Sequence, residues 1–347
     1  MSLKEQTRQL WKQCFDDSEA FIDLYFGRRY SDAINHVRQV DGQVVAALQA
    51  VPYDMTFGAG YVVPVAYVSG ACTHPDHRCR GEMHRLLAET HRSLYAQGKW
   101  FSTLIPANEG LFGYYARSGY AACFHRTVEN VVINRGDTPV DNSERILEIS
   151  SIELLKSFDE PVGNFINEQL LQRPCCIQHT VDDLQVVCHD IWLDGGCCLR
   201  IERGRTLVGL AFCVPLEDDA WKVKELVLAE GVDCTAALRQ IARHCGASRL
   251  TAGLPPCPTR QQKIGMARVL RVVEALHRYA CLYPSCRRTL QVTGDVDIPE
   301  NNGYYRLQEG DCHCGFEASA TYEVLTISEL TAWLLEGLSP TMSLMLD

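Results

Sequence analysis

The sequence predicts an α/β (α+β) fold in which a mixed β-sheet is flanked by helices. Three apolar segments between residues 34 and 73 are separated by turn residues, as in a meander of strands. The third segment leads through a short basic turn into a helical pattern that ends near residue 97, and a further strand is expected at 100–105. A meander followed by alternating helices and strands is typical of a mixed sheet covered by helices.

The elements of the first 135 residues each have a local signal. Apolar spacing over residues 3–30, interrupted at Asp16-Asp17-Ser18, predicts two helices, the second opened by an Asp or Ser cap. Asp41-Gly42 and Gly58-Ala59-Gly60 predict the turns of the meander. Gly98 is expected to end the helix that follows the basic turn. A short helix at 111–117 and a last strand at 127–133 complete this part of the chain.

The rest of the chain repeats this order only weakly. A polar stretch at 136–143 predicts a linker, and the proline-rich segment 255–258 predicts another boundary. Between them we expect helices at 151–171 and 233–244 and strands at 198–201, 206–214, 221–228 and 249–252. Beyond the second boundary we expect helices at 272–279 and 328–335 and strands at 288–293 and 304–307. These signals divide the chain into domains at 1–137, 138–262 and 263–347.

Composition narrows the class of protein. A chain of 347 residues is too long for one ordinary core, which agrees with several domains. The formal net charge of −10 argues against a nucleic-acid partner, and it fits either a solvated acidic surface or an acidic cleft for a cationic substrate. No signal peptide and no apolar run long enough to span a membrane is expected. The 17 cysteines are odd in number, scattered and often adjacent, which favours reduced thiols in a cytoplasmic protein.

The basic turn has the composition of a pyrophosphate site. His74-Pro75-Asp76 ends the strand, and Arg78 and Arg80 precede Gly81 at the start of the helix. Free backbone N–H groups, a helix N-terminus and two guanidinium groups would then face one place. Such an arrangement binds phosphate groups.

The segment Arg78-Cys79-Arg80-Gly81-Glu82-Met83 resembles motif A of the GNAT superfamily of N-acetyltransferases. It departs from the motif at Met83, where the family has a last glycine, and at Cys79, where many members have glycine. Both changes leave the backbone amides in place. The resemblance implies an acetyl-CoA site, with the strand residues 71–73 beside the pantetheine. The residues that it assigns to acetyl-CoA are Ala71, Cys72, Thr73, Arg78, Cys79, Arg80, Gly81, Glu82, Met83, His84, Asn108 and Glu109.

A second segment, from Tyr114 to Tyr120, resembles the helix that carries the general acid of the same superfamily. The resemblance gives this role to Tyr115, because a phenol near the thioester sulfur can donate a proton to the departing thiolate. Backbone amides at 70–73 would orient the acetyl group and stabilise the oxyanion. An amphipathic tyrosine of the core is the alternative interpretation of Tyr115.

The layout of the whole chain resembles the enhanced intracellular survival (Eis) acetyltransferase family. That resemblance implies a second, degenerate GNAT-like domain that lacks the basic turn, and a short sterol-carrier-like domain at the C-terminus. It also implies that the terminal carboxylate of Asp347 acts as a base or holds the substrate ammonium group. The apolar residues between 342 and 346 favour a docked tail, and a frayed tail is the alternative.

The expected function is direct acetyl transfer from acetyl-CoA to a primary amine of a cationic small-molecule or peptide acceptor. A non-catalytic acyl-CoA-binding or regulatory module and a transferase of another acyl group are the alternatives. The resemblance also implies a homo-oligomer. No metal is expected, because Cys312-His313-Cys314 lacks a second ligand pair. His84 and His91 are expected at the surface or beside the phosphates.

Overall fold

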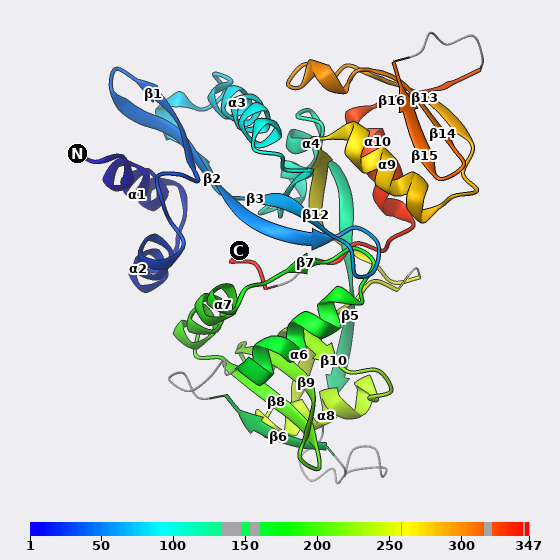
Figure 1. Cartoon of the computed structure of the whole chain (residues 1–347). Coiled ribbons are helices and arrows are strands. Elements are labelled where there is room, and N and C mark those ends of the chain that lie inside the picture. Colours follow the sequence, from blue (N-terminus) through cyan, green and yellow to red (C-terminus); the bar gives the residue numbers. More distant parts are fainter. Residues whose placement is uncertain (134–146, 153–159, 258, 316–320, 343, 347) are drawn as a thin grey trace.

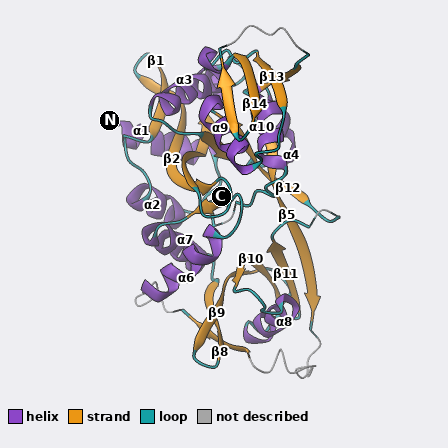
Figure 2. Cartoon of the chain, turned by 45° about the vertical axis from the view of Figure 1, so that its right-hand side comes forward, coloured by secondary structure: helices purple, strands orange, loops and turns teal. Residues whose placement is uncertain are grey.

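One mixed sheet of twelve strands runs from end to end of the molecule (Figures 1 and 2). The structure is a computed structural model that describes residues 1–133, 147–152, 160–257, 259–315, 321–342 and 344–346. The strands follow the order β1 (Asn35–Val40), β2 (Gln43–Thr56), β3 (Val62–Thr73), β4 (Phe101–Leu104), β12 (Gln262–Val269), β5 (Ala121–Val132), β11 (Arg249–Leu254), β10 (Ala220–Leu228), β9 (Thr206–Pro215), β8 (Cys197–Arg203) and β6 (Leu147–Ser151), and β7 (Ile177–Gln178) pairs with β2. The predicted fold class, a mixed sheet flanked by helices, is confirmed.

Two capped helices begin the chain and pack on the first strands. Ser2 closes a capping box on α1 (Leu3–Cys14), and the Ser18 hydroxyl accepts the Phe21 N–H at the start of α2 (Glu19–Arg28). The apolar faces of both helices are buried, with Trp11 and Tyr25 in one cluster. Helix α3 (Glu82–Ala96) and helix α4 (Glu109–Ala116) follow β3 and β4. The elements predicted from residues 1–133 are therefore present.

The two halves of the large sheet repeat one topology and exchange their last strands. In the first half, β1, β2 and β3 lead through α3 to β4, which lies parallel to β3. In the second half, β8, β9 and β10 lead through α8 (Cys234–His244) to β11, which lies parallel to β10. Strand β12 of the second half pairs with β4, and β5 of the first half pairs with β11. Because β12 begins at Gln262, the predicted boundary at 262/263 falls at a strand of the large sheet.

The middle of the chain departs most from its predicted elements. A helix was expected over 151–171, but Ser151 ends the strand β6, and α6 runs from Glu160 to Leu171. Helix α7 (Val181–Leu193) was not predicted, although Thr180 and Asp183 form a capping box at its start. The predicted linker at 136–143 lies outside the described residues.

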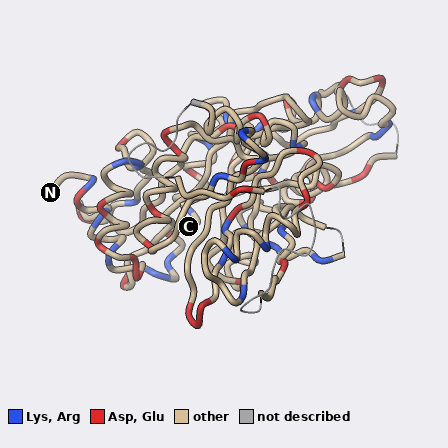
Figure 3. The backbone as a smooth tube through the Cα atoms, turned by 90° about the horizontal axis from the view of Figure 1, so that it is seen from below, with Lys and Arg blue, Asp and Glu red and all other residues tan. Residues whose placement is uncertain are grey.

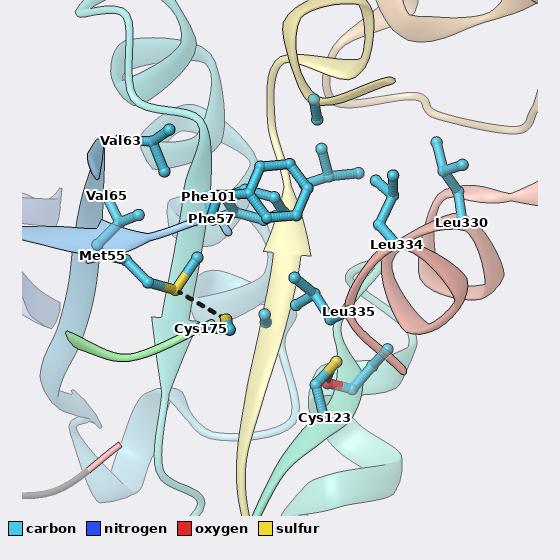
Figure 4. Close-up of a cluster of buried hydrophobic side chains, with 14 of the residues drawn as sticks. Met55, Phe57, Val63, Val65, Phe101, Cys123, Cys175, Leu330, Leu334 and Leu335 are labelled. Atoms are coloured by element: carbon cyan, nitrogen blue, oxygen red, sulfur yellow. Dashed lines mark hydrogen bonds between the residues drawn. The ribbon is translucent and has the colours of Figure 1, made fainter. Parts of the chain in front are cut away.

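The C-terminal part forms a smaller α+β unit. Strands β15 (Asp311–Cys314), β14 (Gly303–Gln308), β13 (Arg288–Thr293) and β16 (Glu323–Thr326) pair in that order beside helices α9 (Val272–Leu282) and α10 (Ile327–Glu336). Figure 4 shows Leu330, Leu334 and Leu335 of α10 facing Phe57 and Phe101 of the large sheet. Each such buried side chain stabilises the fold by about 1.5–3 kcal/mol, so this cluster holds the unit against the sheet.

The end of the chain is docked in the interior, as its apolar sequence predicts. Met342, Leu344, Met345 and Leu346 are all buried. Leu344 and Leu346 belong to the same apolar cluster as Trp11 and Tyr25, and the last described part of the chain lies near the middle of the molecule (Figure 1). Asp347 lies outside the described residues. No helix of the described chain has the length and apolarity needed to cross a membrane.

Candidate active site

The strand β3 is bulged at Gly70. Three residue steps of β3, from Ser69 to Cys72, lie opposite two steps of β2, from Ala47 to Gln49. Gly70 has a φ of 57°, and a Cβ there would collide with the Trp11 ring and with the Gln49 side chain. Glycine is therefore required both by the backbone and by the space. A bulge of this kind leaves backbone groups without a ladder partner.

The strands β3 and β4 separate immediately before this bulge. They pair only from Val65 to Tyr67, opposite residues 101–103 of β4, although β3 continues to Thr73. Among the described residues, the edge of β3 from 68 to 73 that faces β4 has no strand on it. An extended molecule with amide groups can pair with such an edge as a further strand would.

The basic turn between β3 and α3 presents backbone N–H groups. After η1 (Pro75–His77), Cys79 has a φ of 59° and Gly81 a φ of 79°, so both lie in the left-handed region. Gly81 is the N-cap of α3, and no side chain caps the first N–H groups of that helix. These groups and the helix dipole make the turn suited to an anion.

The two arginines of the turn take different places. Arg78 Nε donates to the Thr73 carbonyl over 3.1 Å, which fixes this side chain against the end of β3. The carbonyl of Arg80 accepts from Arg85 Nη1 over 3.1 Å, and the Arg80 side chain is exposed. The convergence of both guanidinium groups on one anion stays a prediction.

The start of α3 is held by contacts with the surrounding elements. The Glu82 carboxylate accepts from Arg38 Nε at 3.2 Å and from Arg85 Nη1 at 2.9 Å, so two guanidinium groups offset its negative charge. Met83 is buried against Leu86 and Leu87. The methionine that stands where the family has glycine therefore packs in the core, beneath the turn.

Tyr115 lies on α4 beside the separated strands. Its ring packs in the cluster that contains Ala66 and Val68 of β3, and it meets the Tyr114 and Tyr120 rings edge to face. Burial, followed by the neighbouring Tyr114 and Cys72, raises the pKa of Tyr115 to about 12. The phenol is therefore protonated at neutral pH and can donate a hydrogen bond or a proton.

One cleft of about 550 Å³ joins most of the predicted cofactor residues to Tyr115. The predicted residues that line it are Ala71, Cys72, Thr73, Arg78, Cys79, Gly81, Glu82, Met83, His84, Asn108 and Tyr115. Arg80 and Glu109 do not line it. Cys14 and Phe15 of the first helical segment line it as well and were not predicted. Cys14 was not predictable because α1 reaches the cleft only through its tertiary packing.

Cys14 is chemically distinctive in this cleft. Its Sγ lies 3.4 Å from the Thr73 carbonyl and 3.9 Å from Arg78 Nη2. A hydrogen bond from Cys72 and the charge of Arg78 lower the pKa of the Cys14 thiol to about 6, against the effect of burial. A thiolate is therefore favoured here at neutral pH.

A second cavity of about 360 Å³ lies between the two halves of the large sheet. It is lined by Ile105 and Pro106 after β4, by Asn108 and Glu109 at the start of α4, and by Met342, Leu344 and Met345 of the tail. Asn108 lines both this cavity and the cleft that most of the predicted cofactor residues line, which we call the cofactor-type cleft. Glu109, predicted at the cofactor, therefore faces the second cavity.

Three cysteines meet in the second half, away from both cavities. The sulfur atoms of Cys197, Cys213 and Cys245 lie within 4.8 Å of one another, and hydrogen bonds from the other two lower the pKa of Cys197. Such a trio has the donor set of a soft metal ion. Cross-strand pairing of Cys197 with Cys213 brings two of them together, a register that the sequence alone does not reveal. All 17 cysteines are free thiols.

The fold of GNAT acetyltransferases has two parallel strands that separate, a bulge in one of them and a turn suited to an anion. Strands β3 and β4, the bulge at Gly70 and the basic turn correspond to these features. Residues 2–123 match the family model described as acetyltransferase (GNAT) domain. This N-terminal part of the chain is therefore similar to the GNAT acetyltransferase domain, in agreement with the motif at residues 78–83. No curated protein sequence matches the chain.

Solved structures share the fold over nearly the whole chain. Eis1 from Mycobacterium abscessus aligns with a TM-score of 0.74 at 13% identity, covering 96% of this chain and 87% of its own. A GCN5-related N-acetyltransferase from Anabaena variabilis ATCC 29413 aligns with a TM-score of 0.73 at 16% identity, covering 97% and 96%. A probable N-acyltransferase from Enterococcus faecalis V583 aligns with a TM-score of 0.73 at 15% identity, covering 95% and 86%. At these identities the likeness shows a common fold.

Proposed function

We propose that the first domain, residues 1–137, binds acetyl-CoA and transfers its acetyl group directly to a primary amine. The observation that carries the proposal is the single cleft that the turn residues 78–84, the strand residues 71–73 and Tyr115 all line. An anion site, an open strand edge and a proton donor are the three features that a thioester of coenzyme A requires in one place.

In this proposal the backbone N–H groups of the turn and the Arg78 guanidinium bind the pyrophosphate. The open edge of β3 at 71–73 pairs with the amide groups of the pantetheine arm. The bulge at Gly70 supports an oxyanion site, because it leaves N–H groups of β3 beside the point where β4 separates. These roles rest on the turn, the open edge of β3 and the bulge that the fold provides.

Tyr115 acts as the general acid. The amine nitrogen forms a bond to the acyl carbon, the C–S bond breaks, and the departing thiolate takes a proton from the phenol. A raised pKa keeps the phenol protonated until that charge develops. The alternative role of Tyr115, packing in the core, agrees with the burial of this residue. It does not explain why Tyr115 lines the cleft.

The terminal carboxylate of Asp347 serves as the base or as the anchor of the substrate ammonium group. The support is the docking of Leu346, the residue before it, in the cluster that contains Trp11. The Trp11 ring in turn lies against Gly70 at the bulge. A tail docked in the cluster that also contains Trp11 supports this role for the residue that follows it.

The remaining features of the proposal concern the rest of the chain. Residues 138–262 form a degenerate GNAT-like domain, and residues 263–347 form a short sterol-carrier-like domain in a homo-oligomeric, cytoplasmic enzyme without a metal. The acceptor is a small molecule or peptide. The net charge suggested a cationic acceptor, but five Lys and Arg side chains against two Glu line the second cavity, which does not favour that part of the prediction.

The test is calorimetric binding of acetyl-CoA to the full-length chain, followed by a thiol-release assay against a panel of primary amines. We expect stoichiometric binding and amine-dependent release of coenzyme A, with the N-acetyl product identified by mass spectrometry. Binding without release across the panel would favour a non-catalytic acyl-CoA-binding module. Release with propionyl- or succinyl-CoA but not acetyl-CoA would favour another acyl donor.

A further inference from the structure

The second cavity carries a charge opposite to that of the chain. The whole sequence has 33 Lys and Arg against 43 Asp and Glu. Acidic residues are spread along the whole backbone in Figure 3, so a basic excess in one cavity is a local feature. The basic side chains that line the cavity are Arg126, Arg173, Lys222, Lys224 and Lys263, and the acidic ones are Glu109 and Glu225.

Three of the basic residues line the cavity together with one glycine. Lys222 and Lys224 are two residues apart on β10, and the Lys224 carbonyl lies 3.5 Å from the position that a Cβ on Gly253 of β11 would take. Gly253 pairs with Val128 of β5, two residues from Arg126. Residues that pair across strands point to the same face, as do residues two apart on one strand, so the missing side chain of Gly253 leaves a space beside Arg126. A Cβ on Gly253 would lie 3.5 Å from Arg126 Cδ.

These basic groups differ in how far other residues neutralise them. Arg173 lies 3.4 Å from Glu225, and Lys224 Nζ lies 3.9 Å from Asp190. Arg126 Nε is buried and has no hydrogen-bond partner among the described residues. A buried donor without a partner destabilises the protein, and an anionic oxygen that reached it from the cavity would supply the missing acceptor. Arg126 therefore has the unmet hydrogen-bonding capacity expected of an anion anchor.

The cavity lies beside the end of the cofactor-type cleft where the thioester is proposed to lie. Asn108 lines both spaces and forms the N-cap of α4, but its side chain makes no capping hydrogen bond. The first N–H groups of α4 therefore add positive potential where the two spaces meet. The residues after β4 and the docked tail form the remaining walls.

We propose that this cavity binds the acyl acceptor and that the acceptor carries an anionic group, a carboxylate or a phosphate, in addition to its primary amine. The inference rests on the proposed acetyl transfer. The anionic group binds Arg126 next to Lys224, and the amine nitrogen faces Asn108 and the thioester. The reaction balances as amine plus acetyl-CoA to N-acetyl amide plus free coenzyme A, with the amine proton lost and the thiolate protonated.

The experiment compares amines that differ only in the anionic group. 4-Aminobutyrate is compared with butylamine, O-phosphoethanolamine with ethanolamine, and spermidine represents a cationic acceptor. We expect kcat/KM to be at least about 10-fold higher for an anionic amine than for its neutral partner, the size of one charge-assisted hydrogen bond. The carboxylate and phosphate pairs distinguish the two kinds of anion. Equal or better turnover of spermidine and the neutral amines would overturn the inference.

Two variants test the site itself. Arg126→Gln should raise KM for the preferred anionic amine about 10-fold with little change in kcat and none in acetyl-CoA affinity. Arg205→Gln, in the exposed turn between β8 and β9, is the matched control and should leave all three unchanged. Gly253→Leu should fill the space beside Arg126 and abolish acceptor binding while acetyl-CoA still binds. An unchanged KM in Arg126→Gln would overturn the assignment.

A binding measurement separates this inference from the proposed function. With the protein saturated by free coenzyme A, calorimetry should detect the anionic amines but not butylamine or ethanolamine, and Arg126→Gln should weaken that binding about 10-fold. If acetyl-CoA itself fails to bind, the proposed function fails. If acetyl-CoA binds and neither anionic amine binds, only the inference about the acceptor fails.

Discussion

His91 Nδ1 lies 2.8 Å from the Asp297 carboxylate in the interior, so α3 is tied to the C-terminal unit. On the other side of the ring, His91 Nε2 lies 3.1 Å from the Tyr120 hydroxyl, which also contacts Ser102 Oγ at 2.6 Å. A neutral imidazole satisfies both contacts if Nδ1–H donates to Asp297 and Nε2 accepts from Tyr120. The prediction that His91 lies at the surface or beside the phosphates is wrong, because this ring is fully buried.

This pair predicts that the fold loses stability in mild acid. Burial, followed by the charge of Arg268, lowers the pKa of His91 to about 4. The unfolded chain, with its histidine near pKa 6.5, therefore binds more protons between pH 6.5 and 4, and the free energy of unfolding falls as pH falls through that range. For Asp297, burial acts to raise the pKa, but His91 and Arg268 lower it overall, which adds to the loss at low pH.

Urea unfolding between pH 7.5 and 4.5 checks this prediction. We expect a fall of up to about 3 kcal/mol in the free energy of unfolding from His91. His91→Gln keeps a donor and an acceptor but does not titrate, so it should be less stable at pH 7.5 and show a shallower pH dependence. His277→Gln, whose ring is exposed beside Asp311, is the matched control. Equal slopes in His91→Gln and the wild type would contradict the prediction.

The Gly70 bulge predicts a large difference between two glycine substitutions. Gly70→Ala must accommodate a Cβ against Trp11 and Gln49 as well as a left-handed backbone, whereas Gly60 (φ 73°) has nothing within 4 Å of the same position. Both variants lose about 1 kcal/mol for the backbone. We expect Gly70→Ala to lose a further 1–3 kcal/mol or so from overpacking, measured as the free energy of unfolding in urea. Comparable losses would show that Trp11 moves aside without cost.

Local signals were enough to predict the first half of the fold. Caps such as Ser18, turn pairs such as Asp41-Gly42 and the Gly81 turn act over a few residues, so the sequence displays them directly. The exchange of β5 and β12 could not be predicted, because strand partners far apart in sequence leave no local pattern. The same reason explains why Cys14 and Arg126 were missed: each reaches its cavity through tertiary packing. Arg80 and Glu109 were predicted at the cofactor from their places in the motifs; they do not line the cleft, and their contact with acetyl-CoA stays a prediction.

The different places of Arg78 and Arg80 predict unequal effects on cofactor binding. Arg78 lines the cleft and is fixed by the Thr73 carbonyl, whereas Arg80 does not line it. Arg78→Gln should weaken acetyl-CoA binding about 10-fold, as expected for one charge-assisted contact to phosphate. Arg80→Gln should weaken acetyl-CoA binding far less, because it removes only a positive charge that lies outside the cleft. Calorimetric titration of both variants with acetyl-CoA measures the two effects. A greater loss of affinity in Arg80→Gln than in Arg78→Gln would reverse the assignment.

Cys14 predicts a thiol that acetyl-CoA protects. Because its pKa is lowered to about 6 in the lining of the cleft, Cys14 should react with iodoacetamide at pH 7 faster than an ordinary thiol of similar exposure. Peptide mass spectrometry can follow this residue separately from the exposed Cys257, Cys281 and Cys314. Saturating acetyl-CoA should slow the labelling of Cys14 without changing that of Cys281. Equal labelling with and without acetyl-CoA would place the bound molecule elsewhere.

Tyr115 provides the most direct test of the chemistry. Tyr115→Phe keeps the ring and its packing against Tyr114 and Tyr120 but removes the donor. Loss of a general acid lowers kcat by roughly 10²-fold or more, and acetyl-CoA affinity should change little, because the phenol acts only as the thiolate forms. Tyr279→Phe, in the C-terminal unit, is the matched control for removing a tyrosine hydroxyl. Wild-type kcat in Tyr115→Phe would return this residue to the role of a core tyrosine, because burial alone would then explain its place beside the separated strands.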